Sequence, residues 1–278
     1  MRPVDVFHIG PQKAATTWVY RCFSEHPAIA CPPTDSIHYY DIYYAKGKRW
    51  YANFFRGARQ DQLLFDPTFT YIRSPWAPRR IVDDNPEAKI ICLLRNPVNR
   101  AFSHYWHEKK KGKIAFGFHE VLENYDLFSS WVEPGFYAEH LERYLEYFSR
   151  DQLLCLQFRQ LKEDDEAFLR RILEFIEVDP SFKPSWLGKK ANEAGGRQTF
   201  TNAIWRRVRR RLRWIGQTEL IETVEEAPVL GRWMSDREEY ERGMNEETRE
   251  ELQKICEPEI QRTEELLNLD LSHWRSGL

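Results

Sequence analysis

The 278-residue sequence has no apolar run near the roughly 20 residues that a membrane-spanning helix needs. A strand-like run begins by about residue 4, which leaves no room for an amino-terminal signal peptide. Cysteine is scarce: there are five, an odd number, and none forms a CxxC pair. We therefore expect unpaired, reduced thiols, a cytoplasmic location and no membrane span. No convincing metal-ligand cluster is present, so no metal is expected.

An excess of one charge is also absent. Lysine and arginine total 41 and the acidic residues 43, which gives a net charge of −2 and argues against a general nucleic-acid binder. The chain is long enough to bury a sizeable core, and it contains no internal repeat or clear linker. We therefore treat residues 1–278 as a single domain. Aromatic residues reach 14%; they suit either a hydrophobic core or an apolar acceptor pocket, and the core is the simpler explanation.

Strand-like and helix-like segments alternate along the chain. We predict strands at 4–9, 63–66, 89–95 and 153–158, and helices at 15–26, 75–84, 97–111, 135–148, 164–177 and 245–268. The runs 89–95 and 153–158 are mostly apolar, as expected of strands buried on both faces of a parallel sheet. The alternation predicts a three-layer α/β fold with a central, mostly parallel sheet flanked by helices.

The stretch FHIGPQKAATTW (7–18) is not a nucleoside-triphosphate P-loop, because that motif reads GxxxxGK[ST] and the lysine here comes too early. A strand nonetheless ends on Gly10, and Thr16 and Thr17 open the predicted helix. Such a turn directs backbone N–H groups and the positive end of the helix dipole at one point, where Lys13 adds a full charge. The spacing suits a compact anion, although an ordinary strand-to-helix turn beside a stray lysine is an equally good explanation.

A second motif, LLRNPVNRAFSHYWH (93–107), places Arg95 at the end of a buried strand and Ser103 on the following helix. In a parallel α/β sheet, ligands collect outside the carboxyl ends of the strands, so Arg95 should face the same crevice as the 10–17 loop. Arginine suits bidentate recognition of phosphate. Two anion sites along one sheet edge predict a ligand with two separated phosphate-type groups.

Together these motifs resemble those of the sulfotransferases that use PAPS (3′-phosphoadenosine 5′-phosphosulfate). GPQKAATTW resembles their 5′-phosphosulfate loop, and LLRNPVNRAFSHYWH resembles their 3′-phosphate motif. Similarity to the heparan-sulfate and bacterial branch extends to YYAKGKRWYANFF (43–55), YIRSPWAPRRI (71–81) and EELLNLDLSHW (264–274). The resemblance implies a P-loop-like fold related to nucleotide kinases, with PAPS as co-substrate.

By motif position, the resemblance implies that the 5′-phosphosulfate is bound by Gln12, Lys13, Ala14, Ala15, Thr16, Thr17 and Trp18. Arg95 and Ser103 would hold the 3′-phosphate. Gly196 and Arg197 are the match to a late loop that closes the nucleotide site. Ala15 stands where the family often has glycine, which is a mild change if φ is negative there.

Sulfuryl transfer and phosphoryl transfer make similar demands on a protein. The group moves in line between two oxygens through a loose transition state, and charge builds on the bridging oxygen of the leaving nucleotide. Lys13 is the candidate to stabilise that charge.

An alcohol acceptor also needs a base to take its proton. In DSIHYYD (35–41) the position of the branch's glutamate holds Ser36, which cannot act as that base. His38 and Asp66 are the candidates, ahead of Asp35, and the unperturbed pKa of histidine suits neutral pH best. The structural alternatives are a packed polar histidine and an aspartate that caps the following turn.

The expected acceptor is a hydroxyl or amine of a carbohydrate or small natural product, with 38–55 and 116–137 lining its pocket. The arginines at 206–213 form either a clamp for an anionic acceptor or a solvated helix face. Two other functions stay open. A P-loop nucleotide kinase would require GxxxxGK[ST] and an acidic Mg²⁺ ligand. A PAPS- or PAP-binding protein without catalysis is suggested by Ser36. The sequence does not indicate an oligomeric state.

Overall fold

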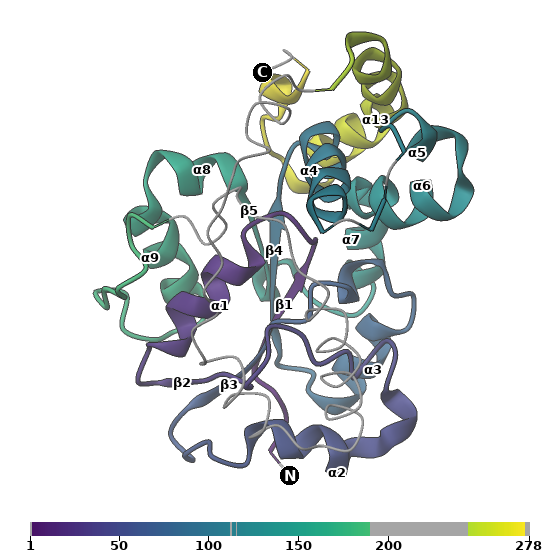
Figure 1. Ribbon diagram of the computed structural model, residues 1–278. Coiled ribbons are helices and arrows are strands. Elements are labelled where there is room, and N and C mark those ends of the chain that lie inside the picture. The colour runs from purple at the N-terminus through teal and green to yellow at the C-terminus, as the bar shows by residue number, and fades with distance from the viewer. Residues whose placement is uncertain (1, 112, 115, 190–243, 276–278) are drawn as a thin grey trace.

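The computed structural model describes residues 2–111, 113–114, 116–189 and 244–275 (Figure 1). Gly196, Arg197 and the arginine cluster at 206–213 lie outside these ranges. At the centre is a five-stranded sheet in which every strand pair is parallel, in the order β2-β3-β1-β4-β5. The strands are β1 (Val6–Gly10), β2 (Ile29–Ala30), β3 (Leu63–Asp66), β4 (Lys89–Leu94) and β5 (Leu153–Gln157).

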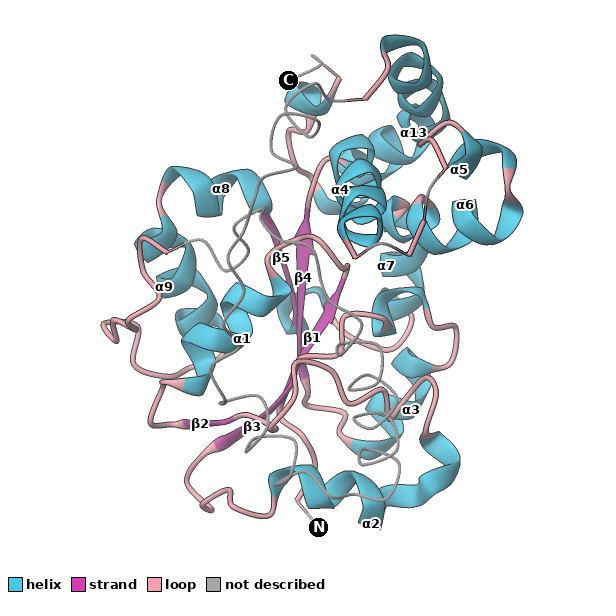
Figure 2. Ribbon diagram, viewed as in Figure 1, coloured by secondary structure: helices cyan, strands magenta, loops and turns pink. Residues whose placement is uncertain are grey.

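Helices cover both faces of the sheet, which gives three layers (Figure 2). On one side lie α1 (Thr16–Ser24), α8 (Phe158–Glu163) and α9 (Asp165–Phe175). On the other side lie α3 (Ala77–Asp84), α4 (Pro97–Lys110), α7 (Tyr137–Leu145) and α13 (Glu246–Leu267). Shorter helices occupy the connections: α2 (Gly47–Ala52), α5 (Glu120–Glu123) and α6 (Tyr125–Trp131).

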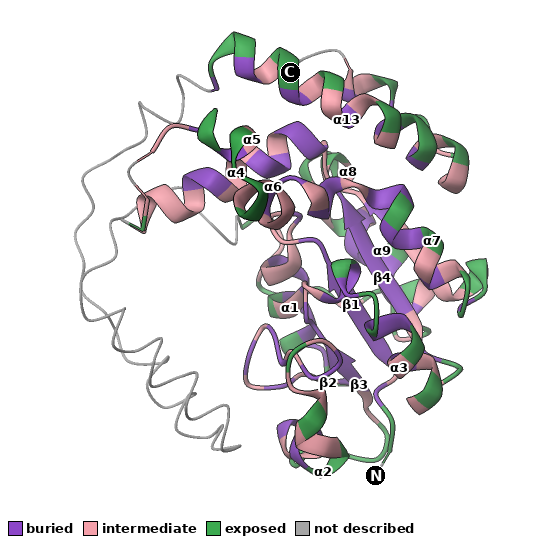
Figure 3. Cartoon of the chain, turned by 90° about the vertical axis from the view of Figure 1, so that its right-hand side faces the viewer, coloured by how far each residue is buried: buried purple, intermediate pink, exposed green. Residues whose placement is uncertain are grey.

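Neighbouring side chains along a strand enter different cores, because they point to opposite faces of the sheet. Val6 packs in the cluster under α1 and α9, whereas Phe7 packs in the cluster under α3, α4, α7 and α13. Strand β1 is buried throughout and β3 and β4 are buried after their first residue, whereas the outer faces of α13 and α2 are largely exposed (Figure 3). Apolar burial of this kind contributes about 25 cal/mol per Å².

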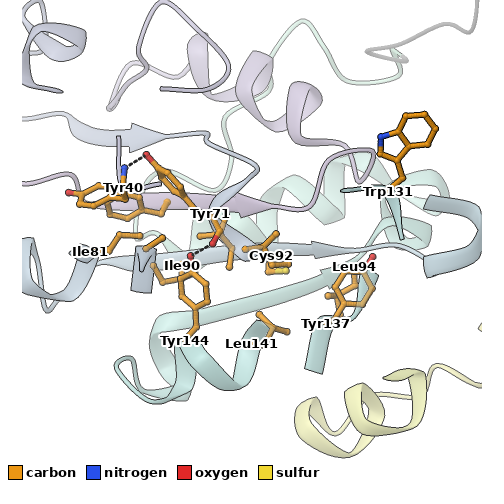
Figure 4. Packing of buried hydrophobic residues seen from close by; sticks show 14 of the residues in the cluster. Tyr40, Tyr71, Ile81, Ile90, Cys92, Leu94, Trp131, Tyr137, Leu141 and Tyr144 are labelled. Carbon is orange, nitrogen blue, oxygen red and sulfur yellow. Dashed lines mark hydrogen bonds between the residues drawn. The ribbon is translucent and has the colours of Figure 1, made fainter. Parts of the chain in front are cut away.

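The aromatic residues of segment 38–55 are mainly core. Tyr39, Tyr40 and Tyr51 are almost fully buried and contact one another. The Tyr71 hydroxyl accepts a hydrogen bond from the Tyr40 backbone N–H, and the Tyr144 hydroxyl donates to the Tyr71 carbonyl (Figure 4). These aromatic residues therefore stabilise the fold, and the expectation that segment 38–55 lines an acceptor pocket stays a prediction.

The predicted α/β fold is confirmed, and the predicted strands and helices all occur within a few residues of their expected bounds. The prediction that the strand at 153–158 is buried on both faces was wrong. Strand β5 is an edge strand in which only Leu156 is fully buried. The end of α13 and the segment after it pack beside β5: Leu267 and Leu269 share a pocket with β5 residues, and the Gln157 side chain donates to the Asp270 carbonyl.

Candidate active site

The loop between β1 and α1 has an unusual backbone. Gly10 has a φ of 116°, and a Cβ there would lie 2.0 Å from the Phe69 carbonyl oxygen. Lys13 and Ala15 also have positive φ, 74° and 67°. The condition of a negative φ at residue 15 is therefore not met, and Ala15 occupies a left-handed conformation that glycine adopts with less strain.

The amino terminus of α1 has no side-chain cap. Its N-cap residue is Ala15, and Thr16 and Thr17 are the first helical residues, as predicted. Within the described ranges, no backbone N–H from residues 12–17 donates to another residue, and neither threonine hydroxyl has a hydrogen bond. Unsatisfied donors at a helix amino terminus suit an anion.

Arg95 follows the carboxyl end of β4 and reaches this loop. Its Nη1 donates to the Lys13 carbonyl oxygen over 2.8 Å, although the two residues are 82 positions apart. The Tyr137 hydroxyl fixes the Arg95 backbone by accepting from its N–H and donating to its carbonyl, and the guanidinium lies over the Phe158 ring. The two anion motifs therefore meet at one place on the sheet edge.

Lys13 is the half-buried cation of the loop. Burial, reinforced by repulsion from Lys111, Arg95 and Arg100, lowers its pKa to about 7, against an opposing contribution from Glu108. In the described part of the chain, no side chain forms a salt bridge or hydrogen bond with Lys13 Nζ. An ammonium in this setting favours an added anion, because the anion would relieve the repulsion.

The remaining members of the predicted nucleotide site are placed as follows. Ser103 is half-buried on α4, and no described residue forms a hydrogen bond with its hydroxyl. Ala14 and Trp18 are buried in the core under α1, so only their backbone could face a ligand. Gln12 is half-buried at the turn of the loop.

Asp66 ends β3 and is completely buried. Its carboxylate accepts hydrogen bonds from the hydroxyls of Tyr51 and Tyr71, over 2.7 and 3.0 Å, and from the backbone N–H and hydroxyl of Thr68. Burial raises its pKa, against the effect of these hydrogen bonds. The geometry matches the structural alternative, because the carboxylate organises the turn after β3 and is already saturated with donors.

His38 lies in a different setting. Its backbone has a φ of 61°, and its ring makes an edge contact with Phe69, the residue whose carbonyl touches Gly10. Its Nδ1 lies 3.0 Å from Thr70 Oγ1 and 3.5 Å from Asp41 Oδ2. The histidine is therefore held beside the strand end from which the anion loop begins.

Asp41 was not singled out from the sequence. Burial would raise its pKa, but hydrogen bonds from His38, Thr70 and the Ile42 backbone outweigh burial, and the pKa is lowered. The aspartate is thus an anion at neutral pH. Its spacing of three residues from His38 was the available sequence signal.

Other site chemistries find no support in the described residues. Within those ranges, no group of at least three His, Cys, Asp or Glu side chains could hold a metal ion. None of the helices in those ranges is long and apolar enough to cross a bilayer. The geometry defines an α/β protein with a candidate anion site built from backbone N–H groups, one lysine and one arginine.

Comparisons with known proteins agree with this class. The sequence profile of the sulfotransferase domain family matches residues 3–266. The bifunctional heparan sulfate N-deacetylase/N-sulfotransferase 4 of Mus musculus is 33% identical over 196 residues, which is 64% of this chain and 22% of that protein. The corresponding enzyme 2 of Homo sapiens is 33% identical over 192 residues, 62% of this chain and 22% of its own length. The chain thus spans about a fifth of these relatives.

Among solved structures, a sulfotransferase from Alicyclobacillus acidocaldarius shares the fold, with a TM-score of 0.72, 24% identity and 99% coverage of both chains. The chain belongs to the sulfotransferase domain family, since the family profile covers nearly its whole length. The predicted family and the P-loop-like α/β fold are confirmed.

Proposed function

We propose that this protein transfers a sulfuryl group from PAPS to a hydroxyl or amine of a carbohydrate or small-molecule acceptor. The observation that carries the proposal is the hydrogen bond from Arg95 to the Lys13 carbonyl, which joins the two anion motifs in one site. A nucleotide with phosphate-type groups at both its 3′ and 5′ positions is the ligand class that such a site suits.

The donor set fits PAPS. The 5′-phosphosulfate would be held by residues 12–18: the backbone N–H groups of the loop, the Thr16 and Thr17 hydroxyls and the Lys13 ammonium are all donors, and no described carboxylate pairs with that ammonium. Arg95 and Ser103 would hold the 3′-phosphate. When bound, PAPS supplies an activated sulfuryl group whose leaving group is a phosphate.

Lys13 would act at the bridging oxygen between sulfur and phosphorus. Charge develops on that oxygen as the S–O bond breaks, so a cation placed there stabilises the transition state more than the ground state. Replacing Lys13 with alanine should lower kcat by about 10²–10³-fold.

His38 is the better-supported base of the two candidates. Asp66 has no exposed surface and is saturated by donors from Tyr51, Tyr71 and Thr68, so an acceptor hydroxyl cannot reach it without disrupting the core. The His38 ring lies nearer the surface and contacts Phe69, whose carbonyl lies against Gly10 at the start of the anion loop. Asp66 would then stabilise the fold around the site.

The acceptor class draws support from the relatives, whose names assign them N-sulfotransferase activity on heparan sulfate. An amine-bearing glycan is therefore the first acceptor to test. The kinase alternative lacks support, because the GxxxxGK[ST] motif is missing and the family profile is that of sulfotransferases.

Two measurements test the proposal. Thermal shift with adenosine 3′,5′-bisphosphate should raise the melting temperature, Mg·ATP should not, and Arg95→Ala should abolish the effect. Mass spectrometry should then detect an added SO₃ group when PAPS is incubated with one of three probe acceptors: de-N-sulfated heparin, N-acetylheparosan or 2-naphthol. Lys13→Ala serves as the blank.

A nucleotide-binding protein without catalysis is the second candidate, because Ser36 stands at the family's glutamate position. Ser36 is buried and its carbonyl accepts a hydrogen bond from Thr34, so it offers no substitute base. This candidate predicts the thermal shift but no sulfated product from any acceptor.

A further inference from the structure

The surroundings of His38 form a short chain of hydrogen bonds. The Thr70 hydroxyl donates to Asp41 Oδ2, and His38 Nδ1 lies 3.0 Å from Thr70 Oγ1. The aspartate also accepts from the Ile42 backbone N–H over 2.7 Å, so its position is fixed from two sides. Both side chains of the His38–Asp41 pair are largely buried, with 15% and 12% of their surface exposed.

The direction of each bond follows from proton counting. A hydroxyl carries a single proton, and that of Thr70 is committed to the Asp41 carboxylate. Thr70 Oγ1 can therefore only accept from His38, which requires a proton on Nδ1. With its pKa lowered, Asp41 is an anion and cannot supply a proton in return. Neutral His38 is thus the Nδ1–H tautomer, and the lone pair lies on Nε2.

The lone pair is available for chemistry. Within the described part of the chain, no residue forms a hydrogen bond with His38 Nε2, and this nitrogen is not among the fully buried unpartnered atoms. The ring is held by its Phe69 contact and by a left-handed backbone, whose N–H donates to Thr68 and whose carbonyl accepts from Ile42 and Tyr43.

We propose that Asp41 and Thr70 are positioning residues that fix the Nδ1–H tautomer of His38 and so make Nε2 the base of the transfer. The inference rests on the proposed function. As the acceptor oxygen or nitrogen forms its bond to sulfur and the sulfur–phosphate bridge breaks, the acceptor proton passes to Nε2. The imidazolium that forms keeps its Nδ1–H on Thr70 and faces the Asp41 carboxylate.

The charges around the ring favour this role. Asp41 lies on the same loop, and Asp66 reaches the His38 backbone through the Thr68 hydroxyl at the end of β3. Tyr71, which also bonds Asp66, has a pKa raised well above its ordinary value by burial and by these aspartates, and so stays neutral. Among the residues that the structure describes, Asp41 alone has a carboxylate within 4 Å of the imidazole, at 3.5 Å from Nδ1.

The tautomer can be read without any acceptor. Long-range ¹⁵N–¹H spectra of the full chain labelled at histidine should show a protonated Nδ1 and an unprotonated Nε2 for His38, assigned by the signal lost in His38→Gln. Thr70→Val and Asp41→Asn should move His38 toward the Nε2–H form. Thr70→Ser keeps the hydroxyl and should retain the wild-type spectrum. A wild-type His38 with its proton on Nε2 would overturn the proposal.

Kinetics give the second readout, with PAPS and whichever of the three probe acceptors forms product. Asp41→Asn should lower kcat by about 10–100-fold, leave the dissociation constant of adenosine 3′,5′-bisphosphate unchanged, and move the acid limb of the pH–rate profile to lower pH. In a His38→Gln background, Asp41→Asn should have no further effect. The exposed Asp83→Asn is the matched control.

Failure of this inference is separable from failure of the proposed function. If Asp41→Asn lowers kcat equally with and without His38, the aspartate acts by another route, while nucleotide-dependent thermal shift and product formation still support sulfuryl transfer. If His38→Gln keeps wild-type kcat, the histidine is not the base and the inference falls. Loss of the thermal shift itself would instead remove the nucleotide site.

Discussion

At the scale of single residues, Lys13 combines a cationic role with an environment that disfavours its charge. Burial and nearby cations lower its pKa to about 7, whereas an ordinary lysine stays charged well above that pH. Binding of an anionic nucleotide favours the charged ammonium, which is fully populated only below this pKa. Nucleotide binding should therefore be coupled to proton uptake above neutral pH.

We expect the dissociation constant of adenosine 3′,5′-bisphosphate to rise with pH above about 7, by up to about tenfold per pH unit. Isothermal titration calorimetry between pH 6.5 and 8.5, in buffers of different ionisation enthalpy, measures the constant and the proton uptake together. Lys13→Arg retains a permanent charge and should flatten the dependence. An equal pH dependence in that variant would show that another group titrates.

Ala15 carries backbone strain at its φ of 67°. Ala15→Gly should stabilise the protein by about 1 kcal/mol, since the left-handed conformation costs an L-residue roughly that amount and costs glycine little. Urea denaturation measures the difference. The neighbouring Ala14, which is buried and has no positive φ, is the matched control, and Ala14→Gly should destabilise instead.

At the scale of elements, α4 links the nucleotide site to the carboxyl-terminal part of the chain. The Asn96 side chain caps α4 by accepting from the Asn99 N–H over 3.1 Å, and it donates to the Trp274 carbonyl over 2.8 Å. The residue next to this cap is Arg95, and Ser103 lies on the same helix. The Asn96 amide therefore contributes to the orientation of Arg95 and Ser103, the residues proposed to bind the 3′-phosphate.

Asn96→Ala should cost about 1 kcal/mol of stability through the lost cap and should also weaken binding of adenosine 3′,5′-bisphosphate. Asn124 caps α6 in the same way, by accepting from the Leu127 N–H over 3.1 Å. Asn124→Ala should therefore cost a similar stability and leave binding unchanged. Chemical denaturation and calorimetry on both variants compare the two effects, and equal weakening of binding would argue against the link through α4.

The sequence predicts elements well where one physical signal dominates. The apolar run at β4 and the Asn96-Pro97 start of α4 are of this kind. The two-residue β2 and the short α5, α6 and α8 are too brief for a periodic pattern to form. Strand β5 has the composition of a buried strand, and only the order of the sheet reveals that it lies at the edge.

Some features of the candidate site can likewise be predicted from the sequence, and others cannot. Motif spacing is enough to predict that Lys13 and Arg95 serve one crevice, because strand ends of a parallel sheet share an edge. Backbone conformation at Ala15 and the donors that saturate Asp66 depend on tertiary contacts, chiefly with Tyr51 and Tyr71, which lie in other segments. No local pattern encodes these features, whereas Asp41 lies three residues after His38 and could have been found from that spacing.

At the scale of the whole molecule, several buried histidines couple folding to pH. Burial lowers their pKa values to about 4 for His8, about 2 for His104 and about 4 for His140. Folding thus holds them neutral, whereas the unfolded chain protonates them near pH 6.5. Between pH 6.5 and about 4 the unfolded state binds more protons, so stability falls as the pH falls.

The free energy of unfolding should therefore decrease from pH 7 to pH 5, by up to about 1.4 kcal/mol per pH unit for each such histidine. Denaturation curves at several pH values measure the slope. His140→Gln should make the slope shallower, whereas the exposed His119→Gln should leave it unchanged. A slope unaffected by His140→Gln would assign the acid sensitivity to other groups.

The packing of the segment after α13 beside β5 has a consequence for how the protein behaves in concentrated solution. An outermost strand offers unpaired backbone groups to any second molecule, and natural sheets shield such strands to prevent aggregation. Here the shield includes Leu267, Leu269 and the Gln157–Asp270 hydrogen bond. A chain shortened before residue 267 would keep every strand of the sheet. It should nonetheless self-associate, because the unpaired backbone groups of β5 would be left uncovered.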